Sequence, residues 1–511
     1  MDRAPLHPSV ATAVTFGSSA AVLVLEITAL RLIAPYVGIT LETNTVVIGL
    51  ALAAIATGAW AGGTTADVRP PRGLIGPLLV LGGALVLLVT PAVRWVSSAV
   101  GPESAAGLAL VLAAVTVFAP AAVLSAVPPM VVKLQLASLG ETGATVGRLS
   151  AVGTVGAIAA TFLTGFVLVA LVPVSVILLA TGLLTIAGGL ALTWSARRRG
   201  AETAATGGSL ALALVATATG LLAPDPCDVE TRYHCASVVT DPERQGGRTL
   251  VLDTLRHSYV DLDDPQHLEF AYVRAFAGVL DVHLPAEDEQ DGQDGQGEGG
   301  EGGEGGEGSE VLHVGGGGMT LPRMLLDTRP QSRHTVVEID PGVVDVDREE
   351  LALPDDPRLT VRVADARTEV GRLPDDSQDV YVGDAFGGVA VPWHLTTRET
   401  FTDVDRVLRP GGVVVLNVID RGELAFLAAE VATLREVYPE VAVYADADEA
   451  GNFVLLASRD DLRLAEVDAA VTARESGMTR LSDARLAELT ADAEVLTDYH
   501  APVDQLVGRS G

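Results

Sequence analysis

Two kinds of hydrophobic pattern divide this chain near residue 224. Before that point, apolar runs of about 20 residues recur, the length that a helix needs to cross the hydrocarbon core of a bilayer. The runs that suit spanning helices lie at 11–34, 45–64, 74–97, 105–127, 149–171, 173–194 and 207–223. The last run is the shortest. The pattern therefore predicts an all-α polytopic transmembrane bundle of six or seven spans over residues 1–224.

After residue 224 the pattern changes to that of a soluble domain. Residues 228–262 alternate apolar and polar positions between turn signals, which predicts a small antiparallel β domain over 225–285, closed by a helix at 265–279. The Gly/Glu run at 286–310 has almost no apolar residue, which predicts a disordered linker loop.

From Val311 onward, strand and helix patterns alternate, as in a parallel sheet covered by helices on both faces. Strands are expected at 311–314, 334–338, 360–363, 379–383 and 412–418, with a closing antiparallel pair at 441–446 and 453–459. Helices are expected at 320–328, 341–351, 366–371, 396–408 and 422–436. This order predicts an α/β Rossmann-like domain of the methyltransferase type over 311–460, followed by a helical, then extended tail over 461–511.

The charges of the two halves differ sharply. Ten basic and seven acidic residues give residues 1–223 a charge of +3. Because the whole chain has a net charge of −31, the remaining residues carry −34. A domain this acidic repels nucleic acid and favours cationic ligands such as amines, although a solvated acidic surface is the commoner reason for such a charge. We expect a lipid bilayer and a cationic amine as partners, and whether the chain forms a homo-oligomer stays open.

Basic residues mark the loops of one membrane side. They lie at the N-terminus and in alternate loops, namely Arg3, Arg69, Arg72, Lys133, Arg148 and Arg197–Arg199. By the positive-inside rule, this pattern predicts a multi-pass protein of the cell membrane with a cytoplasmic N-terminus. With seven spans the soluble half lies outside the cytoplasm, and with six it lies inside.

The only two cysteines, Cys227 and Cys235, follow the last apolar run directly. Two lone cysteines eight residues apart suggest a disulfide, which persists in an oxidising compartment. The alternative is a pair of unrelated thiols. A disulfide agrees with seven spans, so the prediction leans toward a soluble domain outside the cytoplasm.

The clearest chemical signal is the segment Val311–Pro341, which reads VLHVGGGGMTLPRMLLDTRPQSRHTVVEIDP. An apolar run enters a glycine turn, a helix pattern follows, and a second apolar run ends at Glu338, as in the first half of a nucleotide-binding βαβ unit. Acidic residues also follow the next two predicted strands, at Asp365 and Asp384. Ligands of a doubly wound sheet bind beyond the carboxyl ends of its strands, so these positions suit an adenosyl ligand.

Each of these positions has an expected role. The turn residues Gly315, Gly316 and Gly317 would approach the ligand backbone-first, and Glu338 would bind the ribose hydroxyls. Asp365 would bind the adenine amino group, and Asp384 would face the reacting end. The alternative for each acid is to cap the helix that follows it, and this alternative is strongest for Asp365.

Residues 229–420 resemble the spermidine synthases, the aminopropyltransferases that move a propylamine group from decarboxylated S-adenosylmethionine to putrescine. The motifs that carry the resemblance are GGGG from Gly315, VEIDP from Val337, ADAR from Ala364, VGDAFGG from Val382 and DVDRVLRPGG from Asp403. The apolar half resembles the membrane domain of fused, multi-span members of that group.

The resemblance implies further roles. Asp384 matches the catalytic aspartate, which orients the acceptor amine and takes its proton, and Tyr272 matches the active-site tyrosine. Decarboxylated S-adenosylmethionine, or S-adenosylmethionine itself, would be a co-substrate, with no tightly bound cofactor and no metal. Two departures concern the amine half of the site. Gly318 stands where the family's GGGDGG has its aspartate, and Val273-Arg274 follow the tyrosine in place of His-Glu.

A changed acceptor, a changed donor and lost catalysis all agree with these departures. The sequence therefore predicts a membrane-bound aminopropyltransferase and keeps two alternatives. One is a non-catalytic amine-binding or regulatory module outside the cytoplasm, attached to a transporter-like bundle. The other is an S-adenosylmethionine-dependent methyltransferase.

Overall fold

The computed structural model of this chain describes residues 6–37, 41–99, 111–112, 114–136, 142–200, 202–222, 227–253, 255–284, 308–388, 390–449 and 451–507. The chain divides into two compact units, Met1–Cys235 and Ala236–Gly511. The predicted linker at 286–310 lies outside the described residues, apart from its last three. The domain boundaries derived from the sequence stay predictions.

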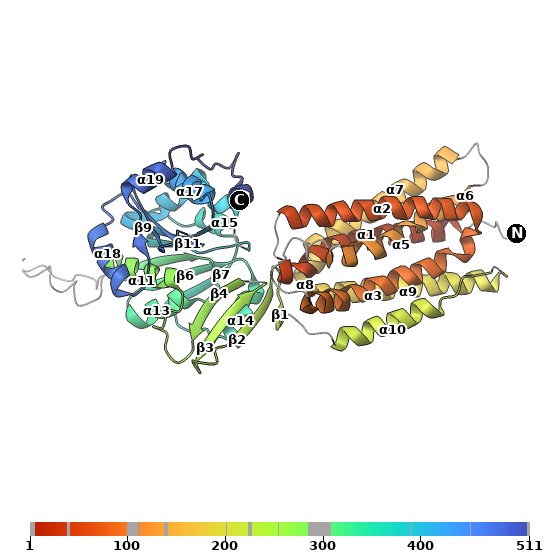
Figure 1. The fold of residues 1–511 in the computed structure, drawn as a ribbon, viewed down its shortest axis with the longest axis horizontal. Coiled ribbons are helices and arrows are strands. Elements are labelled where there is room, and N and C mark those ends of the chain that lie inside the picture. Colours follow the sequence, from red (N-terminus) through yellow and green to blue (C-terminus); the bar gives the residue numbers. More distant parts are fainter. Residues whose placement is uncertain are drawn as a thin grey trace, which may run out of the picture. The chain divides into compact units, whose positions relative to one another are not determined.

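The first unit is a bundle of apolar helices (Figure 1). Its α-helices are α1 (Pro8–Val37), α2 (Leu41–Val68), α3 (Ile75–Ala99), α5 (Ala119–Ser125), α6 (Val127–Gln135), α7 (Thr142–Phe162), α8 (Val169–Leu171), α9 (Val174–Arg198) and α10 (Gly207–Leu222). In the part of the chain that the structure describes, six stretches are long and apolar enough to cross a membrane, which confirms the six longer predicted runs. The seventh run forms the shorter helix α10.

The fourth of these stretches corrects a prediction. Residues 105–110 and 113 of the run expected at 105–127 lie outside the described residues, and the apolar helical stretch that the structure describes there extends from Thr116 to Gln135. The sequence pattern ended at Pro128-Pro129, but α6 begins at Val127 and takes both prolines in its first turn, where an N–H has no helical partner to lose. Lys133 then ends the stretch in an ion pair with Asp67 at the end of α2, with 2.6 Å between Nζ and Oδ1.

Small residues bring α2 close to the helices that follow it in the bundle. A Cβ atom at Gly58 would overlap the carbonyl oxygen of Ala122, and one at Gly62 would overlap that of Ala126. The pattern Gly58-Ala-Trp-Ala-Gly62 therefore serves helix packing, as small residues do in membrane bundles.

The short strand β1 (Val229–Glu230) lies at the end of the first unit. The second unit begins within β2 (Cys235–Thr240), which is followed by β3 (Gly247–Leu252) and β4 (Leu255–Asp261) in a small sheet, and the pairs β2–β3 and β3–β4 are antiparallel. Leu250 and Val260 on its inner face pack against Val343 and Val346 of α14 (Pro341–Glu349). The small sheet is thereby held against the larger α/β fold.

The larger sheet has eight strands in the order β12-β10-β11-β9-β8-β5-β6-β7. Its strands are β5 (Glu310–Val314), β6 (Arg333–Glu338), β7 (Leu359–Val363), β8 (Gln378–Gly383), β9 (Leu408–Asp420), β10 (Glu440–Ala445), β11 (Gly451–Ser458) and β12 (Thr479–Arg480). Strands β5 to β9 are parallel, and β10 to β12 are antiparallel to their neighbours. The predicted fold class is confirmed, with strands at all seven expected places.

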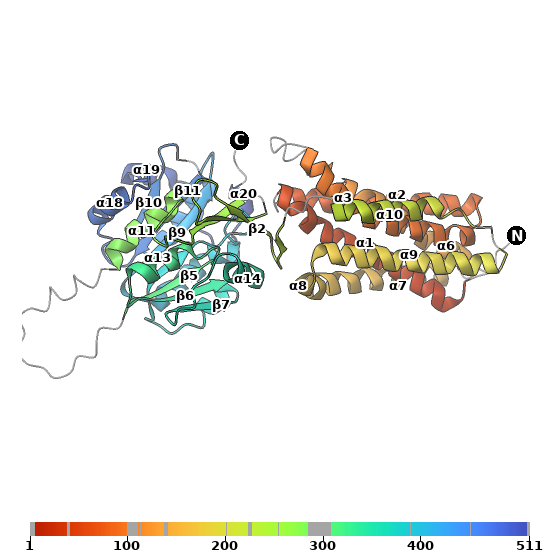
Figure 2. The same ribbon diagram turned by 90° about the horizontal axis from the view of Figure 1, so that it is seen from below.

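Helices cover both faces of this sheet (Figure 2). One core joins the sheet to α11 (Ala271–His283), α13 (Thr320–Thr328) and α18 (Leu464–Ala473). The other joins it to α15 (Ala366–Val370), α16 (Arg398–Val407), α17 (Ala425–Arg435), α19 (Asp483–Leu489) and α20 (Val503–Val507). Strands such as β8 are therefore buried on both sides, as parallel strands usually are.

Two predictions in this unit were wrong in detail. The helix expected at 265–279 begins only at Ala271, because the segment before it starts with a turn in which the carboxylate of Asp264 accepts from the N–H of Gln266 and the carbonyl of Asp264 accepts from the N–H of His267. The tail was expected to be helical and then extended, but Thr479–Arg480 forms the edge strand β12 beside β10.

Candidate functional site

The candidate site lies where the strand order of the large sheet reverses. Strands β5 and β8 are parallel neighbours, and the connections from them lead to opposite sides of the sheet, which leaves a crevice beyond their carboxyl ends. Gly315 follows β5 and Asp384 follows β8, so the sheet brings the glycine turn and this acid together. The backbone N–H of Asp384 donates to the carbonyl of Val314 at 2.8 Å.

Gly315 is required at this contact for two reasons. Its φ is +94°, a conformation that L side chains rarely adopt. A Cβ atom at this position would also overlap the carbonyl oxygen of Asp384. The glycine turn can therefore approach Asp384 closely because Gly315 has no side chain.

The carboxylate of Asp384 is held by two side chains from other elements. Asn417 on β9 donates from Nδ2 to Oδ1 at 2.8 Å, and Tyr272 on α11 donates from its hydroxyl to Oδ2 at 3.1 Å. Asn452 on β11 in turn donates to Oδ1 of Asn417 at 2.9 Å, which fixes the orientation of that amide. Four elements thus set the position of one carboxylate.

Burial raises the pKa of Asp384, and the hydrogen bonds from Asn417 and Tyr272 partly oppose that rise. Burial, together with the neighbouring charge of Asp384, raises the pKa of Tyr272 well above that of an ordinary phenol, so Tyr272 stays a hydrogen-bond donor. A buried carboxylate whose pKa is raised is suited to accept a proton from an ammonium group.

A narrow pocket of about 40 Å³ opens beside Asp384. Aromatic side chains form much of its wall, namely Tyr259, Phe270, Tyr272 and Phe276. A second acid, Glu269, lies at its edge and pairs with His267 at 3.4 Å. Since typical small-molecule sites measure roughly 300–1,000 Å³, this pocket suits a slender chain rather than an adenosyl group. Aromatic faces and carboxylates together favour a cation.

A buried histidine pair stands behind the pocket. His313 on β5 lines the pocket, and its Nε2 lies 3.2 Å from Nδ1 of His334 on β6. Burial lowers the pKa of His334 to about 4 and holds that of His313 well below its usual value. Both rings are therefore neutral at pH 7, so they do not offset the negative charge that Asp384 and Glu269 bring to the pocket.

Glu338, at the end of β6, contacts the glycine turn but does not line the pocket. Its Oε2 accepts a hydrogen bond from the N–H of Gly316 at 2.8 Å, and its Oε1 accepts one from the N–H of Asp340 at 2.9 Å. A carboxylate has about four lone-pair directions, so both oxygens keep the capacity to bind a further group. Gly317, with a φ of +46°, completes the turn.

Asp365 lies apart from these residues. It caps α15, since its Oδ1 accepts from the N–H of Thr368 at 2.8 Å, and its Oδ2 lies 3.3 Å from Nε2 of His394. Burial pushes the pKa of Asp365 up, but the bonds from Thr368 and the neighbouring His394 outweigh it and leave the pKa lowered. The structure therefore brings Asp384, Tyr272 and the glycine turn together, links Glu338 to that turn, and leaves Asp365 outside.

Residues that the sequence analysis missed complete the pocket. Phe276 lies four residues after Tyr272 on α11, a helical spacing that would have identified it. Asn417 and Tyr259 offered no such signal, because Asn417 reaches Asp384 through the pairing of β9 with β8, and Tyr259 reaches the pocket from β4 of the small sheet. Among the described residues, no group of three or more His, Cys, Asp or Glu side chains is arranged to hold a metal ion.

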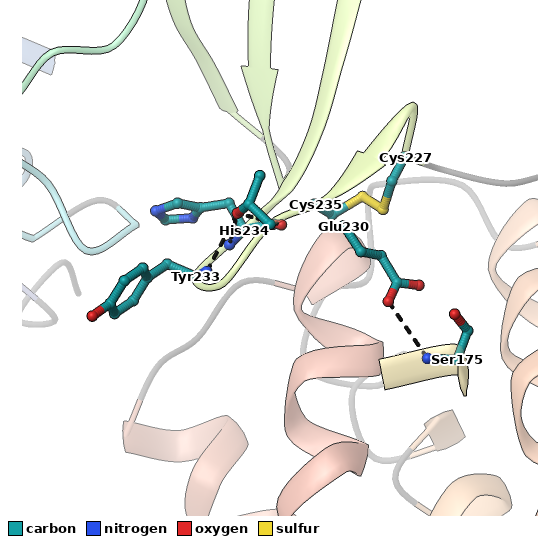
Figure 3. The surroundings of a disulfide bond; sticks show 7 residues. Ser175, Cys227, Glu230, Tyr233, His234 and Cys235 are labelled. Carbon is teal, nitrogen blue, oxygen red and sulfur yellow. Dashed lines mark hydrogen bonds between the residues drawn. A yellow bond between two sulfur atoms is a disulfide. The ribbon is translucent and has the colours of Figure 1, made fainter. Parts of the chain in front are cut away.

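Cys227 and Cys235 form a disulfide at the end of the first unit, with 5.1 Å between their Cα atoms (Figure 3). The loop between them is tied to the helical bundle, since the N–H of Ser175 at the start of α9 donates to Oε2 of Glu230 at 3.4 Å. The disulfide therefore lies at the end of the bundle where α9 begins.

Comparison with known proteins gives a family for part of the chain. Residues 283–442 match the family model described as spermine/spermidine synthase domain. A polyamine aminopropyltransferase of Vibrio vulnificus is 32% identical over 148 residues, which cover 29% of this chain and 49% of the relative. An eEF1A lysine and N-terminal methyltransferase of Xenopus laevis is 32% identical over 139 residues, 25% of this chain and 20% of the relative.

Among solved structures, a probable spermidine synthase from Corynebacterium glutamicum is similar to this chain with a TM-score of 0.46 and 28% identity. The similarity covers 54% of this chain and 97% of that structure. By sequence, the chain spans about half the length of the polyamine aminopropyltransferase that it matches. The family predicted from the sequence motifs is confirmed for the domain in the C-terminal half.

The contact between Gly315 and Asp384 yields a test of the site's geometry. Gly315→Ala is expected to destabilise the second unit by about 2–4 kcal/mol, because it adds a steric overlap to the cost of a positive φ. Gly388→Ala is the matched control, since Gly388 has a φ of +93° but open space around its Cβ position, and it should cost only about 1 kcal/mol. Urea unfolding of both variants measures the difference. Equal losses would contradict the close approach.

Proposed function

Since the C-terminal half of this chain carries a spermine/spermidine synthase domain, we propose that it transfers an aminopropyl group from decarboxylated S-adenosylmethionine to a polyamine such as putrescine. The observation that carries this proposal is the Asp384 carboxylate, held by Tyr272 and Asn417 at the end of an aromatic, acidic pocket. The pocket suits the slender, cationic acceptor.

In the proposed step, the nitrogen of the acceptor amine attacks the propyl carbon bonded to the donor's sulfonium. The new C–N bond forms, the C–S bond breaks, and its electron pair stays on sulfur, which leaves a neutral thioether. Asp384 orients the amine and takes the proton that nitrogen loses, a task for which a raised pKa is favourable. The aromatic walls stabilise the positive charge as it moves from sulfur to nitrogen.

The adenosyl part of the donor would lie outside the narrow pocket, against the turn Gly315–Gly317. Glu338 already rests on that turn and keeps lone pairs for the ribose hydroxyls. Asp365 would bind the adenine amino group in addition to capping α15. These three contacts stay predictions of the family resemblance.

The missing acid at position 318 has a local explanation. The N–H of Gly318 donates to Oγ of Ser258 at 2.9 Å, and a Cβ atom there would lie 3.0 Å from both Ser258 and Val260. A larger residue would push the small sheet away from the turn. In place of that missing acid, we assign Glu269 at the pocket edge to bind the ammonium group of the aminopropyl arm.

The rival reading is a non-catalytic amine-binding module outside the cytoplasm, and the course of α10 favours that location. The N–H of Ala204, just before α10, donates to the carbonyl of Gly73 at 3.2 Å, and Gly220 near the end of α10 lies beside Pro91 of α3. The two helices therefore run parallel, and the sixteen residues of α10 span about 24 Å of the ~30 Å thickness of a hydrocarbon core.

We infer that α10 is a seventh span. The residues after it then emerge on the side opposite the basic loops, and the disulfide there agrees with an oxidising compartment. A domain outside the cytoplasm would be separated from adenosyl donors made inside. For that reason, catalysis and location are tested separately.

Catalysis is tested with the purified full-length chain, putrescine and decarboxylated S-adenosylmethionine. Wild-type protein should form spermidine, and Asp384→Asn should lower kcat by about 10²–10⁴-fold because the proton acceptor is lost. Asp345→Asn, an exposed acid on α14, should leave kcat unchanged. Absence of spermidine, combined with putrescine binding that Asp384→Asn abolishes, would favour the non-catalytic module. Methylated product from S-adenosylmethionine would favour a methyltransferase.

Amine binding should depend on pH through Asp384. Only the carboxylate attracts an ammonium group, so affinity is full above its pKa and falls as pH drops through it. Because burial raises this pKa, the loss should begin above the ~3.9 of an ordinary aspartate. Calorimetric titration of putrescine at several pH values measures the midpoint. Tyr272→Phe removes a bond that lowers the pKa, so its midpoint should move further up; an unchanged midpoint would contradict the assignment.

Location is tested through the two cysteines, which are the only ones in the chain. Intact cells are treated with a membrane-impermeant thiol reagent, with and without prior external reduction. Labelling that requires the reductant places Cys227 and Cys235 in a disulfide outside the cytoplasm. Labelling seen only after cell lysis would place them inside and would mean that α10 does not cross the bilayer.

A further inference from the structure

A large cavity lies within the helical bundle of the first unit, between α1, α3 and α9. Its volume is about 900 Å³. Along α1 its lining begins at Leu6 and reaches Val24, and along α9 it extends from Arg199 back to Thr181. At 1.5 Å per residue, the cavity follows these helices for about 25 Å, which is longer than the ~15 Å of one leaflet's hydrocarbon.

The inner part of the cavity has an apolar surface. The hydroxyls of Thr181 and Thr185 donate to carbonyls of their own helix at 2.8 and 2.7 Å, so they offer little to water. Gly17 on α1 and Gly188 on α9 both line the cavity, and a Cβ atom at either position would meet nothing within 4 Å. An elongated space with such walls suits a hydrocarbon chain rather than water.

The end of the cavity nearest the N-terminus is cationic. Arg72, at the start of α3, is only 5% exposed and lines the cavity, and Arg199 and His7 lie at the same end. Among the described residues that line the cavity, none is acidic. The charge of this mouth is therefore complementary to an anionic group.

The three arginines that close α9 differ in their contacts. Arg197 donates from Nε to the hydroxyl of Thr203 at 2.7 Å, and the guanidinium of Arg198 lies 3.5 Å from the ring centre of Trp194. Arg199 makes no such contact with any described residue, and it is the one of the three that lines the cavity. A cation at the cavity mouth is thus left for a ligand.

We propose that this cavity binds one anionic phospholipid from the leaflet that faces the N-terminus. The phosphate lies between Arg72 and Arg199, and one acyl chain runs between α1 and α9 past Gly17 and Gly188. Arginines attract anionic headgroups, so two arginines at the mouth give a preference over a zwitterionic lipid. The site belongs to the Met1–Cys235 unit alone and does not rest on the chemistry of Asp384.

The test uses the purified full-length chain in detergent. After removal of native lipid, the protein is mixed with equal amounts of phosphatidylglycerol and phosphatidylcholine of identical acyl chains, and bound lipid is counted by native mass spectrometry. Wild-type protein should retain one phosphatidylglycerol, with a preference on the order of tenfold. The double variant Arg72→Gln/Arg199→Gln should lose that preference. Arg199→Gln alone, at an exposed position, should weaken the preference for phosphatidylglycerol severalfold. This single variant is the test if the double variant does not fold.

A second pair of variants tests the acyl-chain groove. Gly17→Leu/Gly188→Leu adds side chains at two positions where a Cβ atom meets nothing within 4 Å, and it should lower retention of both lipids about tenfold, with an unchanged melting temperature. The controls are Gly49→Leu, also in open space but outside the cavity, and Arg148→Gln, an exposed cation on α7. Equal retention of the two lipids by wild-type protein would overturn the proposal. Displacement of the bound lipid by an equal concentration of glycerol phosphate would also overturn the proposal, because the site would then recognise a free phosphate.

Discussion

The parallel pairing of β5 with β8 is the constraint on which the candidate site depends. These two strands stand where the strand order reverses, so the loops beyond their carboxyl ends diverge and leave a crevice. Val311, Leu312, Val380 and Tyr381 are buried on the two faces of this pair, and a slip of one residue would turn each toward the wrong face. The hydrophobic core therefore sets the register, and the register places the Gly315 turn against Asp384.

The three acids at the strand ends have different hydrogen-bond partners in the folded chain. Glu338 and Asp365 each accept backbone N–H groups close to them in space, Glu338 from the glycine turn and Asp365 from its own helix. Asp384 is instead held by side chains, through a network that runs from Asn452 by Asn417 to the carboxylate and on to Tyr272. Such a network fixes the carboxylate's position while leaving it facing the pocket, and removing one member disturbs the rest.

The two halves of the chain meet opposite physical demands. The bundle buries small residues between helices and leaves large apolar side chains such as Trp60 and Phe166 exposed, which is stable only in a hydrocarbon solvent. The C-terminal half carries an excess of acids that keeps it in water and raises the local concentration of cations. Helices that are apolar enough to cross a membrane and a spermine/spermidine synthase domain are therefore combined in one chain, and the disulfide lies after the last apolar helix in the sequence.

The sequence by itself determined the apolar helices, the order of strands and helices after Val311, and the acids at three strand ends. Those features follow from local periodicity, which a helix or strand imposes over a few neighbouring residues. Local rules also explain two errors: Asp264 holds a turn where the start of a helix was expected, and α6 takes both prolines in its first turn and so extends beyond residue 127. Only the tertiary structure decided that Asp384 lines a pocket with Tyr272 and Glu269 and is held by Asn417, whereas Asp365 caps α15. These residues are separated by up to about 150 positions in the sequence. The pairing of β8 with β9 brings Asn417 to Asp384, and the packing of α11 against the sheet brings Tyr272 there, both driven by burial of apolar faces.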